Sequence, residues 1–515
     1  MKRKLTLLIL LTTLFSGFPP VVIQAAPVKD AGTLTIAEGA QQQENDHQSD
    51  GSAHNNATEH TNDEGYGEGH SSHSAPPWLV IPFVALLLMI ATGPLFFENF
   101  WHKNYPVIAM LLAAMVVSYY IFVLGNMHEP VHALAEYVQF IALLSSLFIA
   151  SGGILIKVNR KSTPVTNVMI LLVGAVIANL IGTTGASMLL IRPFIRLNNH
   201  RIQPYHVVFF IFIVSNIGGA LTPIGDPPLF LGFLKGVPFF WTMKHNITMW
   251  IFAVIVLLGV FYFLDKKNQK GKMEEETGEP DNKISIIGQK NFLWLAIVIA
   301  SVFVDPNVFN WVPGITYDGA EFSYIREAVM FSVAFLSFRF ASKKAHEGNE
   351  FSFEPIREVA FIFIGIFGTM MPALELVGDF AKSDTGSQLI THNTLYWGTG
   401  VLSGFLDNAP TYINFLTAAM ASQGADIGVP SEVGAFAQGE FNDSILDLNA
   451  IAIAAVFFGA LTYIGNGPNF MVKSIAEQTG IRMPSFFGYI IRFSIPILIP
   501  ILIIVWLIFF AFSPV

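Results

Sequence analysis

Hydrophobic residues along this chain form long runs, and polar residues gather in the short segments between them. Ten runs approach the length of about 20 apolar residues that a helix needs to cross a bilayer. Two more apolar segments, 165–197 and 394–421, are interrupted near their centres by polar residues and Gly or Pro. The pattern predicts an all-α polytopic membrane protein. We expect spans near residues 77–97, 105–125, 133–156, 205–237, 247–264, 291–304, 326–341, 358–378, 449–480 and 485–510.

The chain before the first span divides into two parts. Residues 1–25 have the basic start, short apolar core and small-residue end of a secretory signal peptide, with an uncleaved anchor as the alternative. Residues 26–76 are polar and His-rich, so they cannot bury enough apolar surface to fold alone. We favour a disordered, exported tail over a His-based metal site. Export of this tail predicts a multi-pass protein of a bacterial inner membrane.

Basic residues fix the expected direction of the spans, because loops rich in Lys and Arg stay in the cytoplasm. The segment 165–197 follows Arg160 and precedes Arg201, so both of its ends suit the cytoplasm. The segment 394–421 is followed by 422–448, which carries five acids and no Lys or Arg. Its ends therefore suit the outside. We expect two re-entrant hairpins that enter the membrane from opposite sides.

The membrane part then divides into two halves with the same order of elements. Residues 77–264 and 291–515 each give three spans, a hairpin, a broken span and a whole span, and residues 265–290 form a cytoplasmic linker. The first half begins outside and the second inside, which predicts an inverted-topology repeat. The N-terminal tail and the C-terminus both fall on the periplasmic side.

A ten-residue segment recurs in the two broken spans. Residues 219–228 read GALTPIGDPP and residues 459–468 read GALTYIGNGP, with seven identical positions. Both segments interrupt apolar runs, and such backbone is tolerated at membrane depth only where it is buried in protein or lines a cavity. Matching interruptions in two halves indicate a transporter's binding site. With the two hairpin centres, four interruptions should meet near the middle of the membrane.

These interruptions offer hard oxygen ligands, which suit a small cation such as Na⁺. A charge at mid-membrane costs at least about 2.5–3.5 kcal/mol on insertion scales, so an ion-binding or proton-binding role is favoured. The alternative is that Asp226 and Asp407 cap half-helices. Asp226 matches Asn466, and Asp407 matches Thr183 if the hairpin centres align, so each half gives one acid to a single asymmetric site. The expected ligands are Asp226, Asp407, Asn408, Thr222, Thr462, Asn466, Thr183, Thr184, Ser187 and Thr411, with the amides Asn179, Asn216 and Asn469 nearby.

Composition narrows the function further. Only 13% of the residues are charged, and the chain has no Cys, which rules out disulfides, thiolate metal sites and Cys nucleophiles. No HExxH, Walker or nucleophile-elbow motif is present. We therefore expect a transporter and not an enzyme, with no cofactor beyond the transported Na⁺ and H⁺. Its partners should be small inorganic cations and the lipid bilayer, and not nucleic acid.

The segment 216–226, NIGGALTPIGD, is similar to the Gly-Gly-Ala-x-(Ser/Thr)-Pro-Ile-Gly-Asp motif of NhaD-type sodium/proton antiporters. These antiporters belong to the ion transporter superfamily of arsenite, citrate and dicarboxylate carriers. Residues 407–410, DNAP, resemble the Asp-Asn-x-Pro of that family's second hairpin. The resemblance implies a homodimer in which a transport domain moves against a scaffold domain like an elevator. The chain departs from the family at Thr183, where the first hairpin usually carries an acid.

Three functions stay open at this point. The first is exchange of Na⁺ or Li⁺ for H⁺ by alternating access, with the two ions competing for Asp226 and Asp407. The alternative is Na⁺- or H⁺-coupled symport of a citrate-like organic anion, held by Arg192 or by backbone N–H groups at the hairpin tips. A third is a metal sensor that uses the His-rich tail without transport.

Overall fold

The computed structural model describes residues 75–270, 283–306, 309, 311–317, 320–322 and 324–512. The predicted signal peptide and nearly all of the predicted tail lie outside these residues. Within them the protein is mostly helical, and eight helices are long and apolar enough to cross a membrane. The chain therefore has the predicted character of an α-helical polytopic membrane protein.

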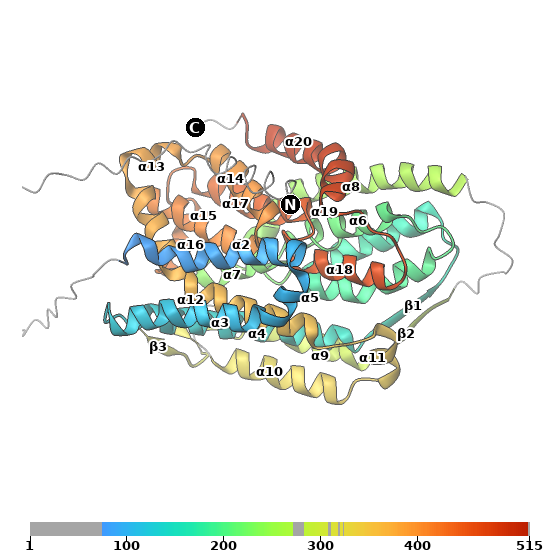
Figure 1. The fold of residues 1–515 in the computed structure, drawn as a ribbon, viewed down its shortest axis with the longest axis horizontal. Helices are drawn as coiled ribbons and strands as arrows, with labels where there is room; N and C mark the ends of the chain where they lie inside the picture. The colour runs from blue at the N-terminus through green and yellow to red at the C-terminus, as the bar shows by residue number, and fades with distance from the viewer. Residues whose placement is uncertain are drawn as a thin grey trace, which may run out of the picture. The chain divides into compact units, whose positions relative to one another are not determined.

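The helices follow the predicted order in both halves (Figure 1). The first half contains η1 (Pro77–Val80), α2 (Ile81–Phe96), α3 (Glu98–Phe122), α4 (His128–Gly152), α5 (Pro164–Leu197), α6 (Pro204–Ile213), η2 (Ile217–Gly219), α7 (Pro227–Lys235) and α8 (Trp241–Lys270). The second half begins with α9 (Lys290–Ser301), α10 (Tyr324–Arg339), α11 (Lys343–Asn349), α12 (Glu354–Lys382) and α13 (Asp384–Leu389). It continues with α14 (His392–Phe405), α15 (Asn408–Ser422), α16 (Pro430–Gln438), α17 (Ser444–Phe458), η3 (Gly459–Leu461), α18 (Gly467–Gln478), α19 (Phe486–Tyr489), the π-helix η4 (Ile490–Leu498) and α20 (Ile499–Phe509).

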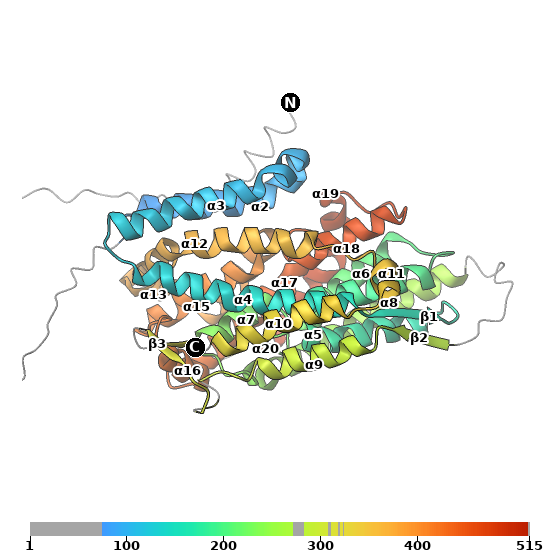
Figure 2. The same ribbon diagram turned by 90° about the horizontal axis from the view of Figure 1, so that it is seen from below.

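The helices pack in two groups. The frame group consists of α2, α3, α4, α9, α10 and α12, which contact one another extensively and are seen as adjacent layers in Figure 2. The site group consists of the interrupted helices α5–α7 and α14–α18 with α8, α19, η4 and α20. The two groups meet mainly where α12 contacts α15 and where α4 contacts α5. The four predicted interruptions therefore all lie in the site group, and the helices of the frame group lie beside it.

Helix α5 folds back on itself at Gly182. This residue has φ 78° and ψ 155°, a backbone conformation that glycine adopts far more readily than other residues. The two limbs then run side by side, because the Asn167 Nδ2 donates a hydrogen bond to the Asn198 Oδ1 at 2.8 Å. The expected tip was the whole polar stretch 182–187, but the break is confined to Gly182. Thr183 already belongs to the second limb, where polar residues suit the first turn of a helix.

Two short strand pairs were not expected. Strand β1 (Leu155–Asn159) pairs antiparallel with β2 (Lys283–Ile287), and β3 (Ile315–Tyr317) pairs with β4 (Ala320–Phe322). The expected span 133–156 therefore ends too late, since α4 stops at Gly152 and the following residues enter β1. The β1–β2 pair connects the first half to the end of the predicted linker.

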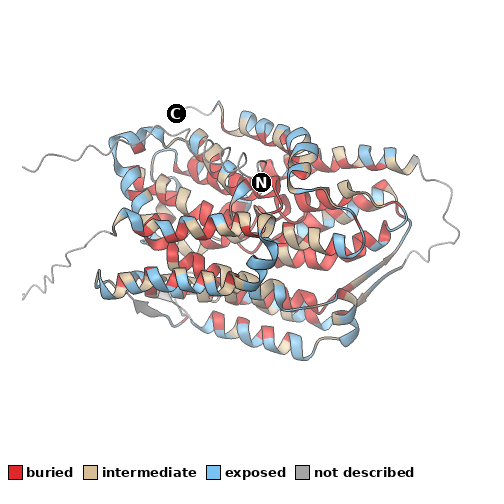
Figure 3. Cartoon of the chain, viewed as in Figure 1, coloured by how far each residue is buried: buried red, intermediate tan, exposed pale blue. Residues whose placement is uncertain are grey.

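Burial is concentrated at the centre of the helical layers (Figure 3). In α6, every residue from His206 to Ile213 is buried, and so are nearly all residues of α17. In contrast, α2, α3 and α20 expose many large apolar side chains, as helices facing lipid do. The interrupted segments therefore lie in the protein interior, where neighbouring groups can satisfy their backbone.

A buried ion pair fixes the open end of the α5 hairpin. The Arg201 guanidinium contacts both Asp265 carboxylate oxygens, at 2.6 and 2.9 Å, and both side chains are almost fully buried. Asp265 also accepts hydrogen bonds from Asn167 and Tyr205. This network links the hairpin to the start of α6 and the end of α8, so these elements are held as one unit.

We expect Asp265→Asn to destabilise the protein by about 3–5 kcal/mol, because the buried Arg201 would lose its counter-charge. The measurement is the apparent melting temperature of the detergent-solubilised protein. Lys266→Gln changes the charge of the exposed neighbour and should leave that temperature unchanged. Equal melting temperatures for Asp265→Asn and the wild type would contradict a structural role for the network.

Candidate functional site

The four interruptions converge on the carboxylate of Asp226, which is only 1% exposed. Its Oδ1 accepts hydrogen bonds from the Thr183 hydroxyl at 2.7 Å and from the Asn466 amide at 2.9 Å. Its Oδ2 accepts a hydrogen bond from the Asn408 amide at 2.7 Å. These donors come from the first hairpin, the second broken helix and the second hairpin. The expected meeting of four interruptions is thus present in the structure.

Helix N-termini around Asp226 stabilise the negative charge of its carboxylate. Asp226 directly precedes α7, Asn466 directly precedes α18, and Thr183 and Asn408 begin helical limbs of the two hairpins. A helix N-terminus carries a partial positive charge, about half an elementary charge in long helices. Four such ends begin at Asp226 or at the residues that donate to it, and within the described part of the chain no Lys, Arg or His forms an ion pair with Asp226. Neutral donors and backbone dipoles therefore hold this acid.

Asn179 holds the unwound backbone of the first broken helix. Its Nδ2 donates to the Gly218 carbonyl at 2.6 Å, and its Oδ1 accepts from the Leu221 N–H at 2.9 Å. The Thr222 hydroxyl donates to the Asn179 carbonyl at 2.6 Å and accepts from the Gly225 N–H. Thr222 thus ties the break to the hairpin, and its hydroxyl does not contact Asp226.

The second broken helix is held in the same way. The Thr462 hydroxyl donates to the Gly404 carbonyl at 2.7 Å and accepts from the Gly465 N–H. The Asn469 amide donates to the carbonyls of Gly459 and Thr462. The Asn469 Oδ1 accepts from the Asn216 amide at 2.6 Å, which connects the two breaks directly.

Each break also leaves two backbone carbonyls that accept hydrogen bonds from side chains of the whole helical segment that follows it. In the first half, Thr242 and Asn246 of α8 donate to the carbonyls of Leu221 and Ala220. In the second half, Ser494 of η4 and Tyr489 of α19 donate to the carbonyls at the matching positions, Leu461 and Ala460. The donors differ in side-chain type, but the same two backbone groups are satisfied.

The equivalent threonine contacts correct the expected alignment of the hairpin tips. Thr222 contacts Asn179 in the first hairpin, and Thr462 contacts Gly404 in the second. Counting four residues onward from these carbonyls pairs Thr183 with Asn408, and both of these side chains donate to Asp226. The expected match of Thr183 with Asp407 is therefore displaced by one residue, since Asp407 corresponds to Gly182.

The two acids have different surroundings. The Asp407 Oδ1 accepts a hydrogen bond from the Ala409 N–H at 3.0 Å, so Asp407 caps α15 as the alternative interpretation expected. Asp226 occupies the cap position of α7 but makes no side-chain capping bond. Capping therefore accounts for a contact of Asp407 and leaves the burial of Asp226 unexplained.

The other expected ligands divide into two sets. Thr184 lines the cavity beside the site, close to the hairpin tip. The Ser187 hydroxyl instead pairs with the Ser215 hydroxyl at 2.7 Å, and the Thr411 hydroxyl donates to the Asp407 carbonyl. The structure thus gathers Thr183, Asn408 and Asn466 around Asp226, and it directs the hydroxyls of Ser187 and Thr411 elsewhere. Within the described residues, no group of three or more His, Asp or Glu could hold a metal ion.

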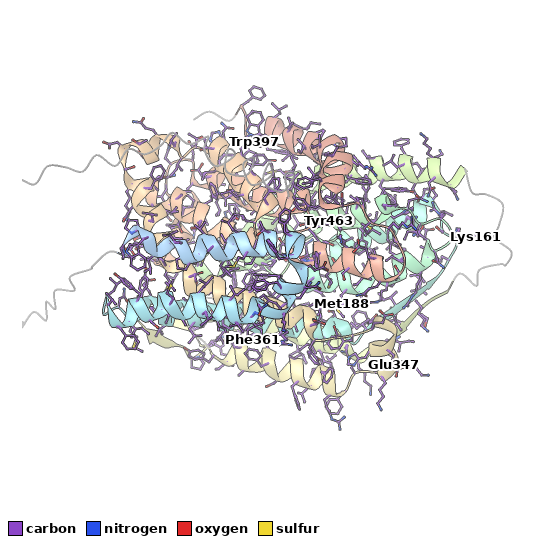
Figure 4. The ribbon with its side chains drawn as sticks, in the orientation of Figure 1. Lys161, Met188, Glu347, Phe361, Trp397 and Tyr463 are labelled. Atoms are coloured by element: carbon purple, nitrogen blue, oxygen red, sulfur yellow. The ribbon has the colours of Figure 1, made fainter. Side chains whose placement is uncertain are left out.

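A cavity of about 1130 Å³ is lined in part by the three donors to Asp226, namely Thr183, Asn408 and Asn466. Site-group helices and the frame helices α2, α3, α4 and α12 form its wall, and Figure 4 labels two of the lining residues, Met188 and Tyr463. Two basic residues line the cavity, Arg192 and Lys473, and His102 lies in the same wall. The acidic lining residues are Glu98, Glu350, Glu354, Glu358, Glu477 and Asp407. The cavity therefore carries a formal excess of negative charge.

Sequence reasoning missed the acidic wall on α12. Glu354 and Glu358 lie at the start of a long apolar helix, where charged residues usually mark only the membrane surface. Their four-residue spacing would place them on one helix face, but which face meets the cavity depends on tertiary packing. No signal in the sequence connected them with Asp226.

A family model described as "Putative citrate transport" matches residues 72–510, which is most of the chain and all but a few of the described residues. A search of curated proteins finds no match.

Gly225→Ala should destabilise the protein by more than about 2 kcal/mol, because a Cβ at this position would collide with the Gly219 carbonyl oxygen. Thermal unfolding of the purified variant measures the effect. Gly467→Ala is the matched control, since nothing lies within 4 Å of a Cβ there. If both variants unfold at the same temperature, the close approach within the break does not limit stability.

Proposed function

This chain belongs to the family described as putative citrate transport, and from that premise we propose that it exchanges Na⁺ or Li⁺ for H⁺ by alternating access. Within this transport family we place it nearest to the NhaD-type sodium/proton antiporters of the ion transporter superfamily. The membrane would be a bacterial inner membrane, with the N-terminal tail and the C-terminus in the periplasm. No cofactor beyond the transported ions is needed.

The buried carboxylate of Asp226 is the observation that carries this proposal. An ionised acid away from water is costly unless it is both hydrogen-bonded and paired with an opposite charge, and Asp226 has hydrogen bonds from neutral partners only. Either a proton or a Na⁺ ion would neutralise it. The two ions then compete for one group, which is the requirement for exchange.

Neutralisation also explains why exchange would be coupled. Moving an unpaired charge through a low-dielectric barrier costs several kcal/mol, whereas a protonated or Na⁺-bound site moves more easily. The empty site would therefore stay on one side until an ion binds. The amide groups of Asn408 and Asn466 could turn their oxygens toward Na⁺, while Asp407 and Thr184 lie on the path from the cavity.

The charge of the cavity supports a cation over an organic anion. Six acidic and two basic residues are among its described lining residues, and Arg192 and Lys473 each pair with one of those acids. A cleft lined by one sign of charge concentrates ions of the opposite sign. The wall would therefore attract Na⁺ and repel a di- or tricarboxylate.

The alternative is Na⁺- or H⁺-coupled symport of a citrate-like anion. It is favoured by the family description, by a cavity large enough for such a molecule, and by Arg192 and the hairpin N-termini in or beside the wall. In this case bound cations would first have to neutralise the acids. The alternative shares the same cation site and differs in the transported solute.

We further propose an inverted-topology repeat with two re-entrant hairpins and two broken transmembrane helices. The matched hydrogen bonds of Thr222 and Thr462 and the matched carbonyls of Ala220 and Ala460 support this repeat. The frame group would be the static scaffold, the site group would move, and the protein would work as a homodimer in the bilayer.

Asp226→Asn should abolish Na⁺- and Li⁺-induced dequenching of a pH-sensitive dye in inverted membrane vesicles, because the amide can neither bind a proton nor balance Na⁺. Asp443→Asn makes the same chemical change at an exposed position with φ 50°, which Asn tolerates, and should exchange like the wild type. Labelled citrate is tested in parallel. Na⁺-dependent citrate uptake without any dye response in the wild type would replace exchange by symport.

Glu358→Gln should raise the apparent KM for Na⁺ about two- to threefold without changing kcat, since the cavity wall loses one attracting charge. Adding choline chloride should shrink the difference, because salt screens such attraction. Glu347→Gln is the control, as this exposed acid lies on α11 and is not among the residues of the cavity wall (Figure 4). An unchanged KM in Glu358→Gln at low salt would contradict electrostatic attraction by this wall.

A further inference from the structure

Two ion pairs link the site group to its surroundings: one reaches Glu136 in α4 directly, and the other reaches Glu350, which follows α11. The Lys235 Nζ lies 2.6 Å from the Glu136 Oε1, and both side chains are largely buried. The Arg192 Nη2 lies 3.1 Å from the Glu350 Oε2; both residues line the cavity, and the Glu350 side chain is exposed. Glu350 follows Asn349, whose amide donates to the carbonyls of Gly152 and Ile154 at the far end of α4. At 1.5 Å per residue, positions 136 and 152 are about 24 Å apart along the helix.

Lys235 is rigidly connected to the ion site. It is the last residue of α7, the nine-residue helix that begins directly after Asp226. The same helix packs closely against the second hairpin, because the Tyr412 ring lies against Gly232. A movement of the site would therefore carry Lys235 with it, while Glu136 stays with α4.

An aromatic contact also joins α4 to α7 and α12. The ring of Phe140 lies 6.3 Å from the ring of Phe230 and 4.4 Å from the ring of Phe363 on α12. Apolar surfaces attract without strong directionality, so they can slide with little preference for one position. A short, partly desolvated ion pair has a defined geometry and is lost on displacement by one helical turn of about 5.4 Å.

We propose that Lys235–Glu136 is a latch that stabilises the conformation in which the cavity is open, and that Arg192–Glu350 assists it at the other end of α4. This inference rests on the proposed alternating access. Passage to the opposite conformation would require both pairs to break. The latch would thus contribute to the relative populations of the two conformations, independently of which ion occupies Asp226.

Single-cysteine labelling tests the latch, because the natural chain contains no Cys. Ser474→Cys lies in the cavity wall and reports the open cavity. Thr417 on α15 is 6% exposed and packs against Gly378 of α12. A cysteine at this position, Thr417→Cys, therefore reports separation of α15 from α12. A polar maleimide is reacted with each reporter in the full-length, detergent-solubilised protein in choline buffer. The quantity compared is the ratio of the Thr417→Cys rate to the Ser474→Cys rate.

Glu136→Gln and Lys235→Met should each raise this ratio about fivefold, as expected for removal of one partly buried ion pair. The double variant Glu136→Lys with Lys235→Glu restores the pair in reversed order and should return the ratio toward the wild-type value. Glu327→Gln removes an ion pair of similar length within the frame group and should leave the ratio unchanged.

A ratio within twofold of the wild type in both single variants overturns the latch. A raised ratio that the reversed pair fails to lower overturns it as well. Labelling requires no transported ion, so its outcome does not depend on whether the vesicle assay detects exchange. A failed dye assay with the expected labelling would reject Na⁺/H⁺ exchange and retain the latch.

Discussion

The hydrogen bonding of one carboxylate organises this structure. Asp226 is buried at the point where two hairpins and two broken helices meet, and its three side-chain donors come from three other segments. Each donor lies where a helix begins at an interruption: Thr183 follows Gly182, Asn408 begins α15, and Asn466 directly precedes α18. The interruptions therefore act together, because each places a helix start and its donor beside the same carboxylate.

Interrupting the helices leaves backbone N–H and C=O groups without intrahelical hydrogen bonds, and the surrounding helices supply partners for them. Unwound residues at membrane depth expose N–H and C=O groups that lipid cannot satisfy. Asn179 and Asn469 bond the unwound chain from nearby, and α8, α19 and η4 bond the carbonyls from behind. The whole helix after each break is thus a structural part of the site, although it does not contact Asp226.

Much of this architecture was predictable from the sequence. The paired ten-residue segments and the basic residues flanking 165–197 predicted the interrupted helices and their order. The polar residues within the interruptions predicted that Asp226, Thr183, Asn408 and Asn466 belong to one site. The sequence could not separate these residues from Ser187 and Thr411. Hydroxyl residues favour both loops and first helical turns, so only the exact break at Gly182 decides which side chains point inward. The strand pair β1–β2 and the acidic wall on α12 depend on contacts between distant segments, which periodicity does not report.

The wide separation of the Asp226 partners in sequence has a consequence for synthesis. Asn408 follows Asp226 by 182 residues and Asn466 follows it by 240 residues. While the first half is being inserted, only Thr183 is present to bond the carboxylate. The nascent first half therefore holds an acid that its own residues satisfy incompletely, and burial of that acid must wait for the last broken helix. The carboxylate of Asp226 can therefore gain its full set of donors only after most of the second half has been synthesised.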